Sequence, residues 1–298
     1  MPCIIVITHN NAGTLRMALE SLVNSELADR IIIIDNNSID DSQSIIKEFM
    51  AKYQFVKGLF LKKNVGFAAG VNIGFKACGS AEPYFALFNP DAIATRDWLK
   101  KLVEFMDENG DVGMAQSLLV KPNGEYDSAG GFINGLGYPI EFRPGVDYEL
   151  LRKVGPYEVG YAKGAAVLIR REAYLQVGGF DNRFFFYYDE TDLSYRMRRA
   201  GWRIYVVPSS LVFHVGLGSK IPKKELFVLY YLERNHLLFL GKDIKSRLPP
   251  AMAWSLIGAL HEHSSIRLKI RLRAIYDALK LMLGHSVNDP INLNKNNY

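Results

Sequence analysis

The chain has 298 residues, of which 49% are hydrophobic and 22% charged, and it carries a formal net charge of +5. This composition is that of an ordinary soluble protein, and the length gives room for one large domain with a sizeable core and an appendage. The positive excess is mild. An acidic partner such as a phosphate group, a nucleic acid or an anionic membrane is therefore indicated only where basic residues cluster.

The two cysteines, Cys3 and Cys78, are too few for a zinc cluster. Because Cys3 lies in an apolar run, we expect no disulfide framework, and a reducing, cytoplasmic compartment fits. The first residues, MPCIIVITHNN, lack a basic region and predict a first strand rather than a signal peptide. The apolar stretch at 248–260 is too short for a membrane span, which takes about 20 residues.

Apolar runs alternate with helical patterns in the first part of the chain. The continuous apolar runs, each predicted to be a buried strand, are residues 3–8, 31–35, 56–61 and 84–88. Such strands separated by helices indicate a parallel sheet that is covered on both faces. Ligands bind these sheets at the carboxyl ends of the strands, so we expect the chemistry in the loops that follow the four runs.

The pattern changes after about residue 112. Apolar runs at 112–120 and 165–169 predict further strands, and the glycine- and proline-rich stretch 128–145 predicts a long irregular loop. A helix is predicted near 190–200, ending at Gly201. Beyond Lys223 the spacing of apolar residues is helical.

The tripeptide Asn89-Pro90-Asp91 follows a predicted strand. Pro90 has no N–H and cannot lie inside a central strand, so Asp91 is placed at the strand's carboxyl end. A carboxylate there can bind a divalent cation, to which Asn89 offers a neutral oxygen. The same tripeptide also fits an ordinary turn.

Asp35 ends the predicted strand 31–35, a position from which an acid commonly hydrogen-bonds a ribose or a base. It fits equally well as a strand end before a capped helix. Gly66, Gly70 and Gly74 are four residues apart and permit a close backbone approach, with free amides for an anion near the helix start. Their spacing is neither the dinucleotide fingerprint nor the P-loop pattern.

The segment FFFYYDETDL at 184–193 runs from five aromatic residues into three acids. We predict Asp189 as the N-cap of a helix, and Asp192 as its capping-box acid and the partner of Arg196. Glu190 is left without a structural role. A carboxylate beside aromatic side chains can have a raised pKa and act as a general base.

The stretch FHVGLGSKIPKK at 213–224 combines a histidine, glycines and lysines. Such a loop could fold over a diphosphate, with His214 as a ligand of a metal or a phosphate. The alternative is an ordinary solvated loop.

In this order the segments resemble the inverting family 2 glycosyltransferases of the GT-A fold, especially the rhamnosyltransferase-like members of bacteria and archaea. The resemblance covers about residues 3–240. It is carried by the motifs VITHNN, IIIIDNNSIDDS, NVGFAAGVNIGF, FNPDA, GAAVLIRREAYLQVGGFDNRFFFYYDETDLSYRMRRAGW, HVGLGS and YYLERN. It implies an α/β fold with a Rossmann-like, mostly parallel central sheet, helices on both faces and a C-terminal helical extension.

The resemblance also assigns roles to residues. It implies Glu190 as the base that activates the acceptor, Asp189 as its acidic neighbour, and Asp91 and His214 as ligands of Mg²⁺ or Mn²⁺. The donor-binding residues that it implies are Thr8, Asn10, Asp35, Asn64, Gly66, Phe67, Asn72, Asn89, Gly164, Ala165 and Arg196.

Two positions depart from the family pattern. Asn89 replaces the first acid of the DxD motif, and His9 stands where Tyr or Phe is frequent. The resemblance divides the chain into a catalytic domain at 1–222, a helical region at 223–285 and a tail at 286–298 predicted to be disordered. Within the catalytic domain, residues up to about 115 would bind the nucleotide sugar and residues 116–222 the acceptor.

The implied reaction is inverting, metal-dependent transfer of a sugar from a UDP- or dTDP-sugar, dTDP-rhamnose among them. The acceptor would be a hydroxyl of a glycan or of a polyprenyl-diphosphate-linked glycan. The alternatives are a non-catalytic nucleotide-sugar-binding or scaffold protein and a nucleotidyltransferase on a similar fold. The presence of both Asp91 and Glu190 argues against a non-catalytic protein.

The basic amphipathic segment at 266–285 fits a helix that packs on its own domain or on a second subunit, and it fits equally well a helix that binds an anionic membrane surface. Membrane contact would place a cytoplasmic enzyme peripherally on the inner face of the cytoplasmic membrane. No nucleic acid partner is expected.

Overall fold

A computed structural model describes residues 1–142, 145–216 and 224–287. Its main feature is a ten-stranded sheet in the order β10-β12-β6-β11-β4-β1-β2-β3, with β5 paired to β12 and β7 to β6. The strands of the first half are β1 (Cys3–Thr8), β2 (Ile31–Asp35), β3 (Val56–Phe60) and β4 (Tyr84–Phe88). They run parallel to one another, as the apolar runs predict.

The second half makes the sheet mixed. Strand β11 (Ala166–Arg170) runs antiparallel to both β4 and β6 (Val112–Val120), whereas β12 (Arg203–His214) runs parallel to β6. The remaining short elements are β5 (Ala92–Ala94), β7 (Tyr126–Ser128), β8 (Gly131–Ile133), β9 (Pro139–Glu141), α5 (Tyr148–Leu151) and β10 (Tyr157–Glu158). The expectation of an irregular loop at 128–145 is wrong in part, because β8 and β9 form a hairpin there.

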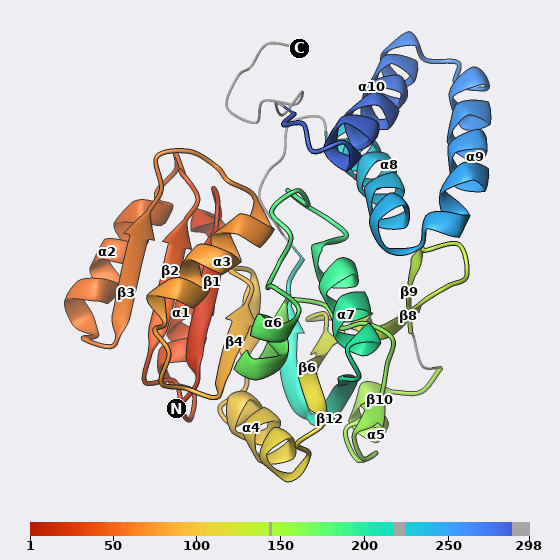
Figure 1. Ribbon diagram of the computed structural model, residues 1–298. Helices are drawn as coiled ribbons and strands as arrows, with labels where there is room; N and C mark the ends of the chain where they lie inside the picture. Colours follow the sequence, from red (N-terminus) through yellow and green to blue (C-terminus); the bar gives the residue numbers. More distant parts are fainter. Residues whose placement is uncertain (143–144, 217–223, 288–298) are drawn as a thin grey trace.

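Helices cover both faces of the sheet (Figure 1). Those on one face are α1 (Ala12–Val23), α2 (Ser42–Lys52) and α4 (Trp98–Glu108), and those on the other are α3 (Phe67–Ala77), α6 (Arg171–Gln176) and α7 (Asp189–Arg199). Strand β1 shows why, since Ile4 and Val6 enter one core layer and Cys3 and Ile5 the other. Successive side chains of a strand point to opposite faces, so a strand that is apolar throughout needs cover on both.

The expectation that the chain has no disulfide is wrong. Cys3 and Cys78 form a disulfide, with Cα atoms 5.9 Å apart. Helix α3 packs across β1, and this brings Cys78, just beyond the end of α3, over Cys3 at the start of the strand. The pairing joins residues 75 positions apart and depends on the fold, so the two isolated cysteines gave no sign of it.

Three longer helices follow the sheet: α8 (Lys224–Asp243), α9 (Leu248–Leu260) and α10 (Ser265–Met282), with the short helix η1 (Lys245–Arg247) between the first two. Helix α8 is tied to α7, because the Lys242 ammonium group pairs with the carboxylates of Asp192 and Asp181. Within the described ranges, no helix has both the length and the apolar character needed to cross a membrane. The predicted tail from 288 onward lies outside the described residues.

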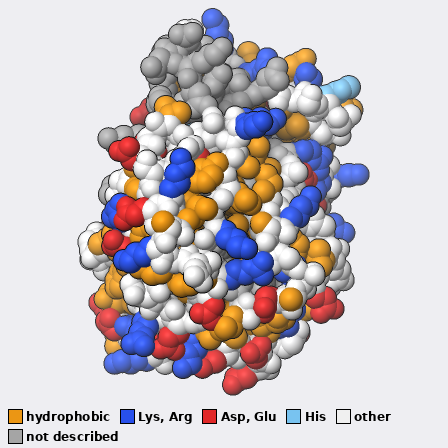
Figure 2. All heavy atoms as spheres, turned by 90° about the vertical axis from the view of Figure 1, so that its left-hand side faces the viewer, with side chains coloured by type: hydrophobic (Ala, Val, Ile, Leu, Met, Phe, Trp, Pro, Cys, Tyr) orange, Lys and Arg blue, Asp and Glu red, His pale blue; other side chains and the backbone are white. Residues whose placement is uncertain are grey.

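The face that carries α2 and β3 mixes basic and acidic side chains around a hydrophobic centre (Figure 2). Charges of both signs are interspersed there, so the positive excess of the chain is not gathered on this face.

Candidate active site

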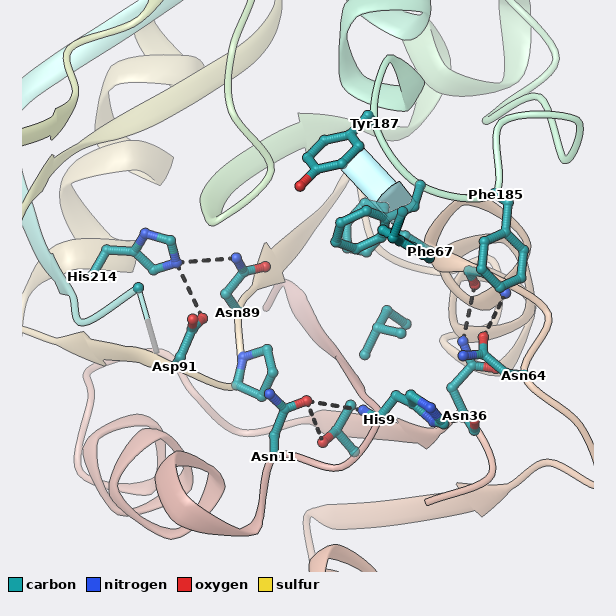
Figure 3. Close-up of a pocket in the computed structure, with 17 residues that line it drawn as sticks. His9, Asn11, Asn36, Asn64, Phe67, Asn89, Asp91, Phe185, Tyr187 and His214 are labelled. Atoms are coloured by element: carbon teal, nitrogen blue, oxygen red, sulfur yellow. Dashed lines mark hydrogen bonds and ion pairs between the residues drawn. The ribbon is translucent and has the colours of Figure 1, made fainter. Parts of the chain in front are cut away.

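The candidate site is a pocket of about 290 Å³ at the carboxyl ends of β1 and β4 (Figure 3). This is the edge at which the parallel strands predict ligand binding. The predicted site residues that line the pocket are Thr8, Asn64, Gly66, Phe67, Asn89, Asp91 and His214. The structure thus brings together residues from four separate stretches of the sequence.

One end of the pocket holds the predicted metal ligands. His214, at the end of β12, places its Nε2 atom 3.1 Å from Asp91 Oδ1 and 3.2 Å from the Asn89 side-chain nitrogen. Strand β12 pairs with β5 just after Asp91, which fixes the distance between the two residues. One imidazole nitrogen therefore faces both polar groups of the Asn-Pro-Asp turn (Figure 3).

Asp127 lies on the opposite side of the His214 ring. Its Oδ2 atom is 2.9 Å from His214 Nδ1 and 2.7 Å from Lys163 Nζ. A carboxylate that accepts from one ring nitrogen fixes the orientation of the imidazole and directs the other nitrogen toward Asp91. Asp127 comes from β7, and the sequence did not single it out.

These contacts control the charge of His214. Burial alone would lower the pKa of His214, but the hydrogen bonds to Asp127 and Asp91 raise it to about 9. Burial would likewise raise the pKa of Asp127, yet the hydrogen bond to His214 and the charge of Lys163 hold it well below its usual value. Without a metal, His214 is therefore a cation between two carboxylates at neutral pH.

The residues fit a divalent cation that is bound together with a diphosphate. No set of three or more His, Cys, Asp or Glu side chains converges on one point in the described part of the chain. Asp91 and His214, with Asn89 beside them, give a smaller set. Mg²⁺ and Mn²⁺ accept such a set when phosphate oxygens and water complete the coordination shell.

The other end of the pocket is lined by polar groups that follow β1 and β2. His9 Nδ1 lies 2.9 Å from the Asn36 carbonyl oxygen, and burial lowers the pKa of His9. The Asn36 side chain accepts from the Val65 N–H at 2.8 Å and donates to the Gly66 carbonyl at 3.2 Å. The sequence predicts Asn36 only as a turn residue, and it gives no role to Asn11, which also lines the pocket. Their positions directly after the predicted strands were the available signal.

Asp35 and Asn10 lie next to this end of the pocket but outside its lining. Asp35 is fully buried and accepts from the Ser38 N–H and from the Gln43 side chain at 2.8 Å. Asn10 has a positive φ of 56°, and its side-chain oxygen accepts from the Ile39 N–H. Both residues shape the loop that follows β2.

Gly66 joins this loop to the aromatic segment. It has φ of 84° at the start of α3, and a Cβ atom there would lie 2.5 Å from the Phe185 carbonyl oxygen. The N–H of Phe67 donates to that same oxygen at 2.9 Å. Glycine is thus required for the close approach, as its spacing with Gly70 and Gly74 suggested. A Cβ atom at Gly70 or Gly74 would instead meet the side chain of Ile7 or Ile5 of β1, respectively.

The aromatic segment before α7 forms a wall of the pocket. Phe185, Phe186 and Tyr187 line the cavity, together with Phe227 of α8. Tyr187 and Tyr188 both have φ of 66°. Asn235 of α8 holds this conformation, because its side-chain nitrogen donates to the carbonyls of Phe186 and Tyr187, each at 2.8 Å.

The prediction that Asp189 is the N-cap is wrong. Tyr188 occupies that position in a left-handed conformation, and Asp189 is the first helical residue. The expected pair of Asp192 and Arg196 is present at 2.6 Å, but the Asp192 side chain turns to Arg196 and Lys242 instead of closing a capping box. The contacts from α8 override the local capping preference.

Asp189 and Glu190 are placed differently. Asp189 is buried, and burial together with the neighbouring Glu190 charge raises its pKa well above the usual value. Glu190 is less buried, and its Oε1 atom accepts from the Gly164 N–H at 3.1 Å. A Cβ atom at Gly164 would lie 2.9 Å from that oxygen and 3.4 Å from the Phe67 ring. Glu190 and Gly164 therefore lie near Phe67, which lines the cavity, but are not themselves part of the lining.

Three other predicted residues hold the framework. Asn72 donates to the Phe180 carbonyl at 2.8 Å, and Arg196 donates to the carbonyls of Val177 and Gly179. The carbonyl of Ala165 accepts from the Asn89 N–H at 2.9 Å and so positions the Asn-Pro-Asp turn. Asn72, Arg196 and Ala165 do not line the pocket. The predicted basic loop falls largely on residues 217–223, which lie outside the described part of the chain.

A pocket lined by polar side chains at the carboxyl ends of parallel strands is the place where α/β enzymes bind their ligands. The family model described as Glycosyl transferase family 2 matches residues 3–178. The chain belongs to this family and is a glycosyltransferase.

Curated relatives extend over most of the chain. It is 28% identical over 306 residues to the N-acetylglucosaminyl-diphospho-decaprenol L-rhamnosyltransferase of Mycobacterium tuberculosis, covering 94% of this chain and 97% of that protein. It is 24% identical over 225 residues to Rhamnosyltransferase WbbL of Escherichia coli, covering 72% and 83%. These relatives support a rhamnosyltransferase-like member of the family.

Solved structures share the fold. GalNAc-T7, crystallised with UDP, GalNAc and Mn²⁺, gives a TM-score of 0.68 at 15% identity over 94% of this chain, which spans 56% of the GalNAc-T7 chain. The mannosyltransferase PcManGT from Pyrobaculum calidifontis, in complex with GDP-Man and Mn²⁺, gives 0.57 at 14% identity over 95% of this chain and 81% of that one. The GT-A fold is thereby confirmed.

Proposed function

We propose that this glycosyltransferase moves rhamnose from a nucleotide-diphosphate donor, dTDP-rhamnose, to a hydroxyl of a polyprenyl-diphosphate-linked glycan, with inversion at the anomeric carbon. The names of the two rhamnosyltransferase relatives support the sugar, and the decaprenol-linked substrate in the name of the first supports the acceptor. The observation that supports the mechanism is that Asp91 and His214 line the pocket, while Glu190 comes from a different element, α7, and is held by the Gly164 N–H near the pocket residue Phe67.

The donor would span the pocket. Its nucleoside would lie among Thr8, His9 and Asn36, and its diphosphate would reach Asp91 and His214 at the other end (Figure 3). These residues, with Asn89, would hold Mg²⁺ or Mn²⁺. When bound, such a cation offsets the charge that develops on the departing diphosphate.

Glu190 is the base in this proposal. Its carboxylate would remove the proton of the acceptor hydroxyl, whose oxygen would then attack the anomeric carbon on the side away from the diphosphate. The raised pKa of Asp189 favours its protonated form, and a carboxyl group that already holds a proton cannot serve as the base. The Gly164 N–H holds Glu190 in place, while Phe67 and the aromatic wall exclude water.

The proposal assigns donor binding to residues 1–115 and the acceptor to residues 116–222. The pocket supports this division in part, because Thr8, His9 and Asn36 at the nucleoside end come from the first stretch, and so does Asp91. The aromatic segment comes from the second stretch, but so does His214, which lies at the diphosphate end.

The test is to replace Glu190 by glutamine and Asp189 by asparagine. Glu190→Gln keeps the side-chain oxygen that accepts from Gly164 but removes the base, so transfer should fall by at least about a hundredfold while donor binding stays near the wild-type value. Asp189→Asn mimics the neutral form of a buried acid and should keep far more activity. Normal turnover by Glu190→Gln would refute the assignment.

A further inference from the structure

Helix α9 turns its large apolar side chains outward and its small ones inward. Its buried residues are Ser255 and Ala259, whereas Trp254 is 70% exposed and Leu260 84%. Ile257 is also exposed, and the helix contains no charged residue. A helix that rests on a protein core in water shows the reverse arrangement. In the described part of the chain nothing covers this apolar face.

Of the partners that the sequence left open for the basic segment, the structure shows packing within the protein. The residues Ala274, Ile275, Ala278 and Leu281 of α10 are buried, and the helix packs chiefly against α8. Much of the apolar stripe of α10 is therefore covered by the protein itself. The larger uncovered apolar surface belongs to α9, which forms an outer edge of the molecule away from the sheet (Figure 1).

The charge around α9 is positive. Residues 245–285 contain seven Lys and Arg residues and two acids, a balance of +5 that equals the excess of the whole chain. Glu262 pairs with Arg267 and Arg271, and Asp277 is fully buried. The exposed basic residues of this segment are Lys245, Arg247, Lys269 and Arg273, of which Arg273 pairs with Asp277. The face in Figure 2, by contrast, mixes both signs.

The exposed apolar face and the positive charge around it together distinguish a membrane from a second copy of the chain as the partner of α9. Two copies of one face with the same positive charge repel each other, whereas anionic lipid headgroups attract it. An apolar helix face that carries a tryptophan and is flanked by basic residues is the composition of a helix that lies in a bilayer interface.

We propose that α9 lies in the surface of an anionic phospholipid bilayer, with Trp254, Ile257 and Leu260 inserted among the acyl chains. Lys245 and Arg247, directly before the helix, would meet the headgroups. Helix α8 links the proposed membrane contact to the pocket, because Phe227 of α8 lines the pocket and Asn235 of α8 holds the aromatic wall. The inference deepens the proposed function, in that the bilayer would present a lipid-linked acceptor to the mouth of the pocket.

The experiment uses the full chain and two kinds of vesicle, phosphatidylcholine alone and phosphatidylcholine mixed with phosphatidylglycerol. We expect the protein to float with the mixed vesicles at low salt and to stay free of the neutral ones. Trp254 is a built-in probe, since its fluorescence should shift to the blue on binding, and Trp254→Phe should remove that shift. The other tryptophans, Trp98 and Trp202, are less exposed than Trp254.

Leu260→Asp should weaken vesicle binding about tenfold or more, because it puts a charge among the acyl chains. Leu175→Asp is the matched control, since Leu175 is 59% exposed on α6 and lies outside the proposed contact. Equal loss in both variants, or no binding of the wild type to mixed vesicles, would overturn the inference. So would a wild-type dimer that Leu260→Asp converts to monomer.

Vesicle binding needs no turnover, so it is independent of the proposed reaction. If Glu190→Gln transfers sugar normally while the wild type binds mixed vesicles, the catalytic assignment fails and the membrane contact stands. If Leu260→Asp loses vesicle binding but still glycosylates a water-soluble acceptor, both stand.

Discussion

The two carboxylates around His214 should make the metal-free protein less stable as the pH rises above neutrality. Although burial would lower it, their hydrogen bonds raise the pKa of His214 from 6.5 to about 9, so the folded protein holds this proton more tightly than the unfolded chain does. The stabilisation is fully present below pH 6.5 and is lost as the pH passes through about 9. At about 1.4 kcal/mol per pH unit, the loss is about 3 kcal/mol.

The assay is urea unfolding in a chelating buffer at a series of pH values, with wild type and His214→Gln measured side by side. The comparison with the variant is needed because other groups of the protein titrate in the same pH range. Burial raises the pKa of Asp243, for example, to about 7. Such contributions are common to both proteins and cancel in the difference. We expect the gap in unfolding free energy to narrow by about 3 kcal/mol between about pH 6 and pH 9.5.

A gap that stays constant to within about 1 kcal/mol, or that widens with pH, would refute this account of the His214 environment. Saturating Mn²⁺ supplies a second check. A metal ligand must be an unprotonated imidazole, so metal should stabilise the wild type more as the pH rises and should flatten its pH dependence.

Three further outcomes are expected. Gly66→Ala should cost about 3 kcal/mol of unfolding free energy in denaturant titrations, because alanine at φ of 84° is strained and its Cβ would meet the Phe185 carbonyl. Gly13→Ala, which meets nothing within 4 Å inside α1, should be neutral or stabilising, and equal losses in the two would contradict the argument. Asp127→Asn should weaken Mn²⁺ binding about tenfold to a hundredfold by calorimetry, and an unchanged affinity would show that His214 needs no second partner. Cys78→Ser should lower the unfolding free energy by about 2 to 4 kcal/mol under oxidising conditions and leave it equal to that of the reduced wild type, whereas a loss that persists under reduction would point to packing instead.

Much of the fold could be predicted from local pattern. Strands that are apolar along their whole length must be covered on both faces, and this requirement alone indicates the parallel half of the sheet. Pro90 cannot continue a strand, so it placed Asp91 at the strand end where the pocket lies. In both cases the deciding interaction lies within a few residues of the sequence signal.

The missed features depend on contacts between distant segments. Asp127 lies in a three-residue strand, and it matters only because His214, 87 positions later, is brought against it. The disulfide of Cys3 with Cys78 has the same origin. Asp189 is a good N-cap by residue type, but Asn235 of α8 fixes the preceding carbonyls and moves the helix start. Intrinsic helix and capping preferences depend on the local residues alone, so they carry no information about such distant partners.

Helix α8 contacts α7, the helix that bears Glu190, at two places. Asn235 of α8 donates to the Tyr187 carbonyl just before α7 begins, and Lys242 of α8 pairs with Asp192 within α7. The region after the sheet is therefore not a separable appendage. A chain shortened before α8 would lose the contacts that hold the aromatic wall and helix α7. We therefore expect the shortest active form of this enzyme to extend past α8, well beyond the end of the last strand.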